Sequence, residues 1–162
     1  MFALRRAAPS ALRAVSRRGY AEVASTSDKL KLSLVLPHET IFSSQDVVQV
    51  NLAAESGDLG VLANHVPSIE ALKPGVLEVI EGSANESKKW FVSGGFANVH
   101  PNNTLTVNAV EAYPLDAFSP EAIRSSLAEA QRVAGGSGTE EEKAEAQIEV
   151  QVYEALQSAL KA

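Results

Sequence analysis

The chain of 162 residues contains no cysteine and only one methionine and one tryptophan. Without cysteine it has no disulfides, no thiolate nucleophile and no cysteine-based zinc site. Its longest apolar runs are a few residues, whereas a membrane-spanning helix needs about 20. It also has no phosphate-binding Gly-Lys-Ser/Thr loop and no G-x-S-x-G nucleophile motif. These absences argue against a membrane-spanning chain and most familiar enzyme classes.

Positive charge is unevenly distributed. Residues 1–20 contain five arginines and no acidic residue, and their apolar residues are scattered. An Arg-rich, acid-free start is typical of a mitochondrial or plastid transit peptide, whereas a secretory signal needs a continuous apolar run. We therefore expect a transit peptide at residues 1–20 and a flexible mature start at 21–28. A basic arm that binds nucleic acid or lipid fits this segment less well than a transit peptide, because the basic character stops at Glu22.

The rest of the chain is acidic. Without residues 1–20 it carries nine basic and 20 acidic residues, a net charge of −11. Such a charge, with no cluster of Lys or Arg, argues against nucleic acid as a partner. We expect a soluble acidic protein inside an organelle, large enough to bury one hydrophobic core.

Residues 29–114 predict an all-β sandwich of about eight to ten short antiparallel strands. Leu30, Leu32 and Leu34 alternate with other residues, which is the period of a strand with one apolar face. Turn residues separate the β-rich runs. The runs that we identify are 29–36, 48–52, 76–81, 89–93 and 105–109. No segment between them reads as a crossover helix, so we expect no parallel pairing.

Residues 118–162 predict a hairpin of two α-helices. Ser119-Pro120 is a good helix start, the glycines at 135–138 end that helix, and Thr139 with Glu142 forms a capping box for the next. Apolar residues recur at helical spacing in both helices. Those expected to pack inside the hairpin are Ile123, Leu127, Ile148, Val152 and Leu156. The faces are rich in alanine, so we expect a hairpin that is marginal alone.

The segment 57–75, GDLGVLANHVPSIEALKPG, is dense in glycine and proline but has no nucleophile, base or metal-ligand cluster. It indicates a surface whose function depends on its shape rather than on reactive groups. The histidines, His38, His65 and His100, are far apart in sequence and lie in turns. A metal hydrolase built on them is one alternative. A free mitochondrial matrix β-sandwich that binds a small ligand is another, although only seven aromatic residues remain outside residues 1–20.

The segment from Leu34 to Ala109 resembles the small β-sandwich subunit of the central stalk of rotary ATP synthases, called delta in mitochondria and epsilon in bacteria and chloroplasts. The matching motifs are Pro37, Ile41-Phe42-Ser43, Gly57-Asp58-Leu59-Gly60-Val61-Leu62, His65-Val66-Pro67, Leu72-Lys73-Pro74-Gly75 and Val92-Ser93-Gly94-Gly95-Phe96. The resemblance implies a non-catalytic rotor subunit that binds no metal or cofactor.

The resemblance also implies partners. It predicts binding to the gamma subunit, to the ring of c subunits and to the small mitochondrial epsilon subunit, on the matrix side of the inner membrane. Turns at one end of the sandwich would face the ring. By motif position these are Pro37-His38-Glu39, Asp58-Leu59-Gly60 and Asn64-His65.

Two positions depart from the family pattern. Asn64 stands where relatives usually have glycine, but asparagine tolerates a left-handed turn. Some bacterial relatives bind ATP through a pattern like I/L-D-x-x-R-A on the first helix. Residues 123–128 read IRSSLA and lack both the aspartate and the arginine, so we expect no ATP site.

Overall fold

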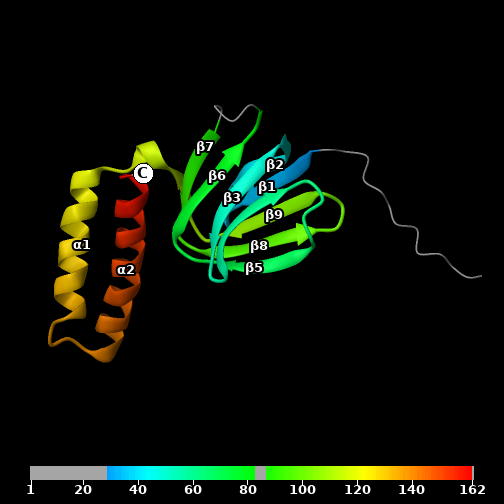
Figure 1. Cartoon of the computed structure of the whole chain (residues 1–162). Helices are drawn as coiled ribbons and strands as arrows, with labels where there is room; N and C mark the ends of the chain where they lie inside the picture. The colour runs from blue at the N-terminus through cyan, green and yellow to red at the C-terminus, as the bar shows by residue number, and fades with distance from the viewer. Residues whose placement is uncertain (1–28, 83–86, 162) are drawn as a thin grey trace, which may run out of the picture.

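The computed structural model describes residues 29–82 and 87–161. The expected transit peptide at 1–20 and the expected flexible start at 21–28 lie outside these residues. The described part forms a two-layered β-sandwich followed by two helices that stand beside one end of it (Figure 1). The prediction of a β-sandwich followed by a helical hairpin is confirmed.

The described residues form ten strands. They are β1 Leu30–Val35, β2 Thr40–Val47, β3 Gln49–Ala54, β4 Gly57–Leu62, β5 Ser68–Leu72, β6 Gly75–Ile80, β7 Ser87–Val92, β8 Gly95–His100, β9 Thr104–Ala109 and β10 Ala112–Pro114. β2, β4, β5, β8 and β10 were missing from the runs identified in the sequence. Glycine, proline and polar residues interrupt the apolar alternation in these strands, so their pattern is weaker.

The strands are ordered β10-β7-β6-β3-β5-β8-β9-β1-β2, and β4 pairs with β3. A single residue pair, Ala54 with Leu72, joins β3 to β5, so the sheet folds over there into two layers. The expectation of purely antiparallel pairing was wrong, because β1 and β9 run parallel. Their crossover connection consists of the intervening strands rather than a helix.

The core lies between the two layers. Leu30, Leu32 and Leu34 of β1 are buried, as their alternation predicted. Across the core, the rings of Phe42 in β2 and Trp90 in β7 meet edge to face with centroids 6.1 Å apart. β2 therefore lies opposite β7. Among the described strands, β4 pairs with β3 alone and lies at an edge of its layer.

After β10, a short 3₁₀ turn, η1 Leu115–Ala117, leads into α1 Pro120–Ala134 and α2 Glu140–Ala159. Ser119 caps α1, and its Oγ accepts the Ala122 N–H. Thr139 and Glu142 form the expected capping box at the start of α2. Neither helix is long and apolar enough to cross a membrane, and these are the α-helices of the described residues.

A small second apolar cluster joins the hairpin to the sandwich. Phe91 of β7 is buried with Ile123 of α1 and Leu156 of α2. The Phe118 ring lies edge to face on Phe91 and on Tyr113, with centroids 5.8 and 6.3 Å apart. The hairpin is therefore attached mainly through the C-terminal part of α2 and the N-terminal part of α1.

The predicted packing of the hairpin is correct except at one position. Ile123, Leu127 and Leu156 are buried, and Val152 is partly buried against the second cluster. Ile148 is 62% exposed, so its predicted packing was wrong. It lies one turn before Val152, on a part of α2 that the second cluster does not reach. Alanine takes its place between the helices, since Ala130 and Ala146 are buried.

Candidate functional site

The structure separates the residues that were expected to form turns at one end of the sandwich. Pro37-His38-Glu39 connects β1 to β2 where β1 pairs with the end of β9, on the side from which the chain continues into the hairpin. Asn64-His65 connects β4 to β5 at the opposite end of β1, next to the β8–β9 turn. The two predicted turns exist, but they do not share one end.

The third segment, Asp58-Leu59-Gly60, is not a turn. All three residues lie in β4 and pair with Ala53, Leu52 and Asn51 of β3. Gly57, at the start of β4, has a φ of 132°, a conformation that L side chains rarely adopt. Gly57 therefore begins a strand, and Asp58 lies in that strand rather than in a turn.

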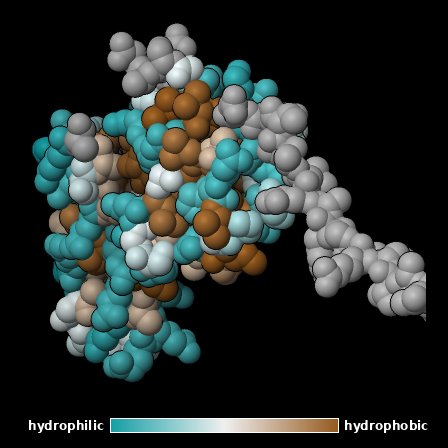
Figure 2. Space-filling view, turned by 45° about the vertical axis from the view of Figure 1, so that its right-hand side comes forward, coloured by the Kyte–Doolittle hydropathy of each residue, from teal (hydrophilic) through white to brown (hydrophobic). Residues whose placement is uncertain are grey.

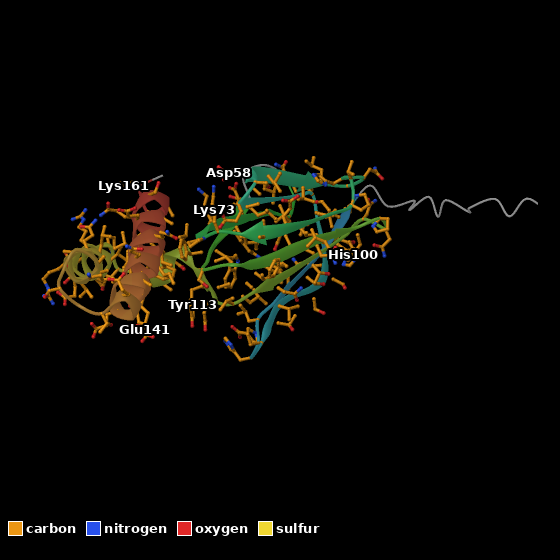
Figure 3. The ribbon with its side chains drawn as sticks, turned by 90° about the horizontal axis from the view of Figure 1, so that it is seen from below. Asp58, Lys73, His100, Tyr113, Glu141 and Lys161 are labelled. Carbon is orange, nitrogen blue, oxygen red and sulfur yellow. The ribbon has the colours of Figure 1, made fainter. Side chains whose placement is uncertain are left out.

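Asp58 lies near the hairpin. Its carboxylate is 3.6 Å from the Lys73 ammonium; the Asp58 side chain is largely in solvent, and the Lys73 side chain is partly buried. The pair borders a groove of about 650 Å³ between the sandwich and α2, where Ala155 and Ala159 form part of the opposite wall. Figure 3 shows Asp58 and Lys73 close together on the hairpin side, with His100 at the far end of the sandwich.

Part of this groove is lined by hydrogen-bonded polar side chains, which lie beside apolar residues such as Leu59 and Val76. The Gln49 amide donates to Asn51 Oδ1 at 2.6 Å, and the Asn51 amide donates to Glu78 Oε2 at 2.9 Å. The hydrogen bond from Asn51 lowers the pKa of Glu78 below its ordinary value. A Cβ at Gly60 would lie 3.2 Å from both amides, so Gly60 leaves room for this network. This part of the groove is thus lined by a fixed set of hydrogen-bonding groups.

The far end of the sandwich carries a short projection, residues 64–66, which we call the distal tip. Asn64 has a φ of 63°, in the left-handed region that the sequence led us to expect. His65 Nδ1 donates to the Val66 carbonyl at 2.8 Å, and Val66 is 74% exposed. The distal tip therefore presents an imidazole and an apolar side chain to the surroundings.

The second layer has an apolar outer face that the sequence analysis missed. Ile69 of β5 and Phe96 of β8 are exposed, and so is Val110, whose N–H donates to the Gly94 carbonyl. Phe96 pairs with Ala71 of β5 and Asn108 of β9, so these three residues lie on one face. Ile69 is two positions from Ala71 and Val110 two positions from Asn108, which places both on the same face as Phe96. We call Ile69, Phe96 and Val110 the outer patch. Its signal was an apolar residue at Phe96, outside the alternation of Ala97 and Val99.

Figure 2 shows how apolar and polar residues are distributed on one face of the molecule. In Figure 2 apolar residues interrupt the polar surface of the sandwich, whereas the side of the hairpin seen there is mostly polar. Exposed apolar residues that gather on one face of a protein typically mark an interaction site. The face of the sandwich seen in Figure 2 therefore offers a candidate surface for a partner.

The histidines do not assemble a metal site. His65 and His100 lie toward the far end, and His38 lies at the other end of β1. Within residues 29–82 and 87–161, no group of three His, Cys, Asp or Glu side chains is close enough to hold a metal ion. No observation in this part of the chain favours the alternative of a metal hydrolase.

Comparison with known proteins identifies related families and structures. The family model "ATP synthase, Delta/Epsilon chain, beta-sandwich domain" matches residues 29–114. The family model "Fungal epsilon subunit of F1F0-ATP synthase C-terminal domain" matches residues 118–158. The two matches together span the sandwich and most of the hairpin.

Curated relatives match over nearly the whole chain. The mitochondrial ATP synthase subunit delta of Agaricus bisporus is 69% identical over 147 residues, which are 91% of this chain and 88% of the relative. The protein of the same name from Saccharomyces cerevisiae is 54% identical over 156 residues, 96% of each chain.

Solved structures also match. A chain in the mitochondrial ATP synthase of Euglena gracilis, described as OSCP/F1/c-ring in rotational state 1, has a TM-score of 0.78 and 27% identity. The match covers 93% of this chain and 90% of that one. A chain in the central stalk and c-ring of the Tetrahymena thermophila enzyme has a TM-score of 0.55 and 19% identity, which shows the fold alone.

Proposed function

The chain belongs to the delta/epsilon family of ATP synthase subunits, together with the mitochondrial delta subunits, and on this premise we propose that it joins the gamma subunit to the c-ring and helps couple proton flow to ATP synthesis. The observation that carries the proposal is 69% identity to a mitochondrial delta subunit over 91% of the chain. As a central-stalk subunit of a mitochondrial complex, it would act through contacts rather than catalysis.

For the gamma subunit, we propose the outer patch as the contact. Ile69, Phe96 and Val110 are exposed on one face of a sheet whose other face is buried in the core. Strands β5 and β8 carry Ile69 and Phe96, and a backbone hydrogen bond to Gly94 holds Val110, so little backbone entropy is lost when a partner covers them. A rotor subunit needs such a contact, because a flexible joint would dissipate torque.

For the c-ring, we propose the free edge of β4 together with the distal tip. Among the described strands, β4 pairs only with β3. Asp58, near the hairpin end of β4, and Leu62, at the end next to the distal tip, are both exposed on its outer face. The carboxylate of Asp58 would suit basic or polar groups on the ring. The Pro37-His38-Glu39 turn lies away from this edge and is not part of the proposed contact. In this position the subunit would be peripheral to the matrix side of the inner membrane.

For the small mitochondrial epsilon subunit, we propose the groove beside α2. Ile148 is exposed on the same helical face as Val152, Ala155 and Ala159, and the latter two line the groove. A partner lying there would cover Ile148 and the alanines on this face of α2. This arrangement would also hold the hairpin against the sandwich.

The outer patch is testable by substitution in the assembled enzyme. Phe96→Asp should leave the fold intact, because the ring is already 59% exposed. It should weaken retention of the tagged chain with gamma by about 2 kcal/mol, the size of an interface hot spot. The measurement is co-purification of gamma and c subunits with the tagged chain from mitochondria.

Val48→Asp is the control, because Val48 is also an exposed apolar side chain but lies outside the outer patch, in the bend between β2 and β3. It should recover gamma normally. Equal recovery of gamma with the Phe96 and Val48 variants would remove the outer patch from the proposal. Failure of the unsubstituted chain to recover gamma or c would overturn the proposed function itself.

A further inference from the structure

Asn103, in the turn between β8 and β9, is the one buried polar or charged residue among residues 29–82 and 87–161. Only 6% of it is exposed, whereas the neighbouring Asn102 is exposed. Buried amides are almost always hydrogen-bonded, because an unsatisfied polar group away from water is costly. The contacts of Asn103 therefore indicate what it holds in place.

Those contacts join three segments that are far apart in sequence. Asn103 Oδ1 accepts the backbone N–H of Asn64, in the distal tip, at 2.7 Å. The Asn103 carbonyl accepts the backbone N–H of Lys31, in β1, at 2.8 Å. The side chain thus holds the distal tip against the β8–β9 turn, and the backbone holds that turn against β1.

The backbone geometry makes the contact specific. Asn103 has a φ of 57° and Asn64 a φ of 63°, so both residues are in the left-handed region. Asparagine enters this region more readily than most other non-glycine residues, and glycine enters it freely. Asparagine at 103 therefore supplies both a tolerated backbone and an acceptor oxygen, whereas glycine would supply only the backbone.

We propose that Asn103 is a positioning residue for the ring contact: through its bond to Asn64 it fixes the distal tip in the shape that docks. The inference rests on the proposed contact between the distal tip and the c-ring. A projection that is already ordered loses less conformational entropy on binding than a mobile one. Without the Asn103 oxygen, the N–H of Asn64 loses its acceptor and the tip gains freedom.

Three variants separate the side chain from the backbone. Asn103→Gly keeps the left-handed conformation and removes the acceptor. Asn103→Asp keeps an oxygen that accepts the Asn64 N–H. Asn102→Gly is the control, because it loosens the same turn at an exposed position.

The assay adds full-length variants back to ATP synthase from which the unsubstituted subunit has been removed, and measures the affinity of rebinding. Asn103→Gly should bind about fivefold more weakly, the loss expected for one hydrogen bond. Asn103→Asp should bind more tightly than Asn103→Gly, because it keeps the acceptor oxygen, and Asn102→Gly should bind like the unsubstituted chain. Hydrogen exchange at the Asn64 amide, measured on the same variants, should accelerate in Asn103→Gly alone.

A substitution in the tip identifies which hypothesis fails. Val66→Asp tests the contact itself and should weaken rebinding, and adding Asn103→Gly to it should cause little further loss. If Val66→Asp has no effect, the distal tip is not a ring contact and both proposals fall. Two other outcomes would contradict the positioning role alone, provided that Val66→Asp weakens rebinding. In the first, Asn103→Gly rebinds with the same affinity as Asn102→Gly. In the second, the losses of affinity caused by Val66→Asp and Asn103→Gly add in the double variant.

Discussion

At the scale of single residues, two glycines show how backbone and packing requirements differ. Gly57 and Gly95 both have positive φ values, 132° and 141°. A Cβ at Gly57 would have no neighbour within 4 Å, whereas a Cβ at Gly95 would overlap the Asn108 carbonyl and lie 2.9 Å from Ala109 Cα. Gly57 is required by its conformation alone, and Gly95 also by the closeness of β9.

This difference predicts unequal losses of stability. Gly57→Ala should lower the free energy of unfolding by roughly 1–2 kcal/mol, the cost of a strained backbone conformation. Gly95→Ala should lower it by more than about 3 kcal/mol, because β8 must also move away from β9. Urea unfolding of the full-length variants measures both. Equal losses of unfolding free energy at the two positions would show that β9 can move away from residue 95 without lowering stability.

At the scale of elements, α2 uses its apolar residues in two ways. Leu156 is buried in the cluster that joins the hairpin to the sandwich, and Ile148, two turns earlier, is exposed. The residues have similar volume and lie on the same helix. Leu156 therefore contributes to packing that stabilises the fold, whereas Ile148 forms part of an exposed apolar surface that a partner could cover.

Alanine substitution should separate these two roles. Leu156→Ala should lower the free energy of unfolding by about 2–4 kcal/mol, because it leaves a cavity between α1, α2 and β7. Ile148→Ala should change it by less than about 0.5 kcal/mol, as expected for a surface position. Denaturant unfolding of the isolated full-length chain provides the measurement. A large loss at Ile148 would mean that this side chain is covered in solution.

The same elements show what the sequence could and could not predict. The alternating leucines of β1 indicated the strand and its buried face, because side-chain direction in a strand depends only on local spacing. β2 was missed because most of its residues are exposed and Ser44 adopts a φ of 51°, at an irregularity in its pairing with β1. Burial of Ile148 was wrongly predicted, because helical spacing identifies a face but not where its partner ends.

Prediction of the site was limited in the same way. The motif around His65 indicated a turn, since the residues that form it are adjacent in the chain. The role of Asn103 depends on Asn64, 39 residues away, and no local pattern reveals that contact. Asp58 was placed in a turn by its position in the family motif, whereas Gly57, Asp58 and Gly60 all lie in β4 and pair with β3.

At the scale of the whole molecule, the sandwich and the hairpin have separate cores. The main core contains only sandwich residues, whereas Phe91 connects the sandwich to the second cluster. The hairpin relies on that cluster, because its helices meet partly through the small residues Ala130 and Ala146. The sandwich should therefore be the independent unit, and the hairpin the dependent one.

A truncation tests this asymmetry. The chain ending at residue 117 should keep its β-sheet circular dichroism spectrum but bind an apolar dye at the uncovered Phe91. Phe91→Gln in the same truncated chain should reduce that binding. A peptide of residues 118–162 should be mostly unfolded, as expected for helices without tertiary contacts. An unfolded truncated chain, or a stable helical peptide, would contradict the separation.

The parallel pairing of β1 with β9 also affects how fast the chain can fold. Paired residues such as Lys31 and Thr104 are 73 positions apart, so β1 emerges early in synthesis while its second neighbour appears much later. Contacts so distant along the chain slow folding, because a long loop must close first. The leucines of β1 therefore stay incompletely buried until β9 pairs with β1. Until then the chain can still pass through a narrow channel in extended form, bind a chaperone or be degraded.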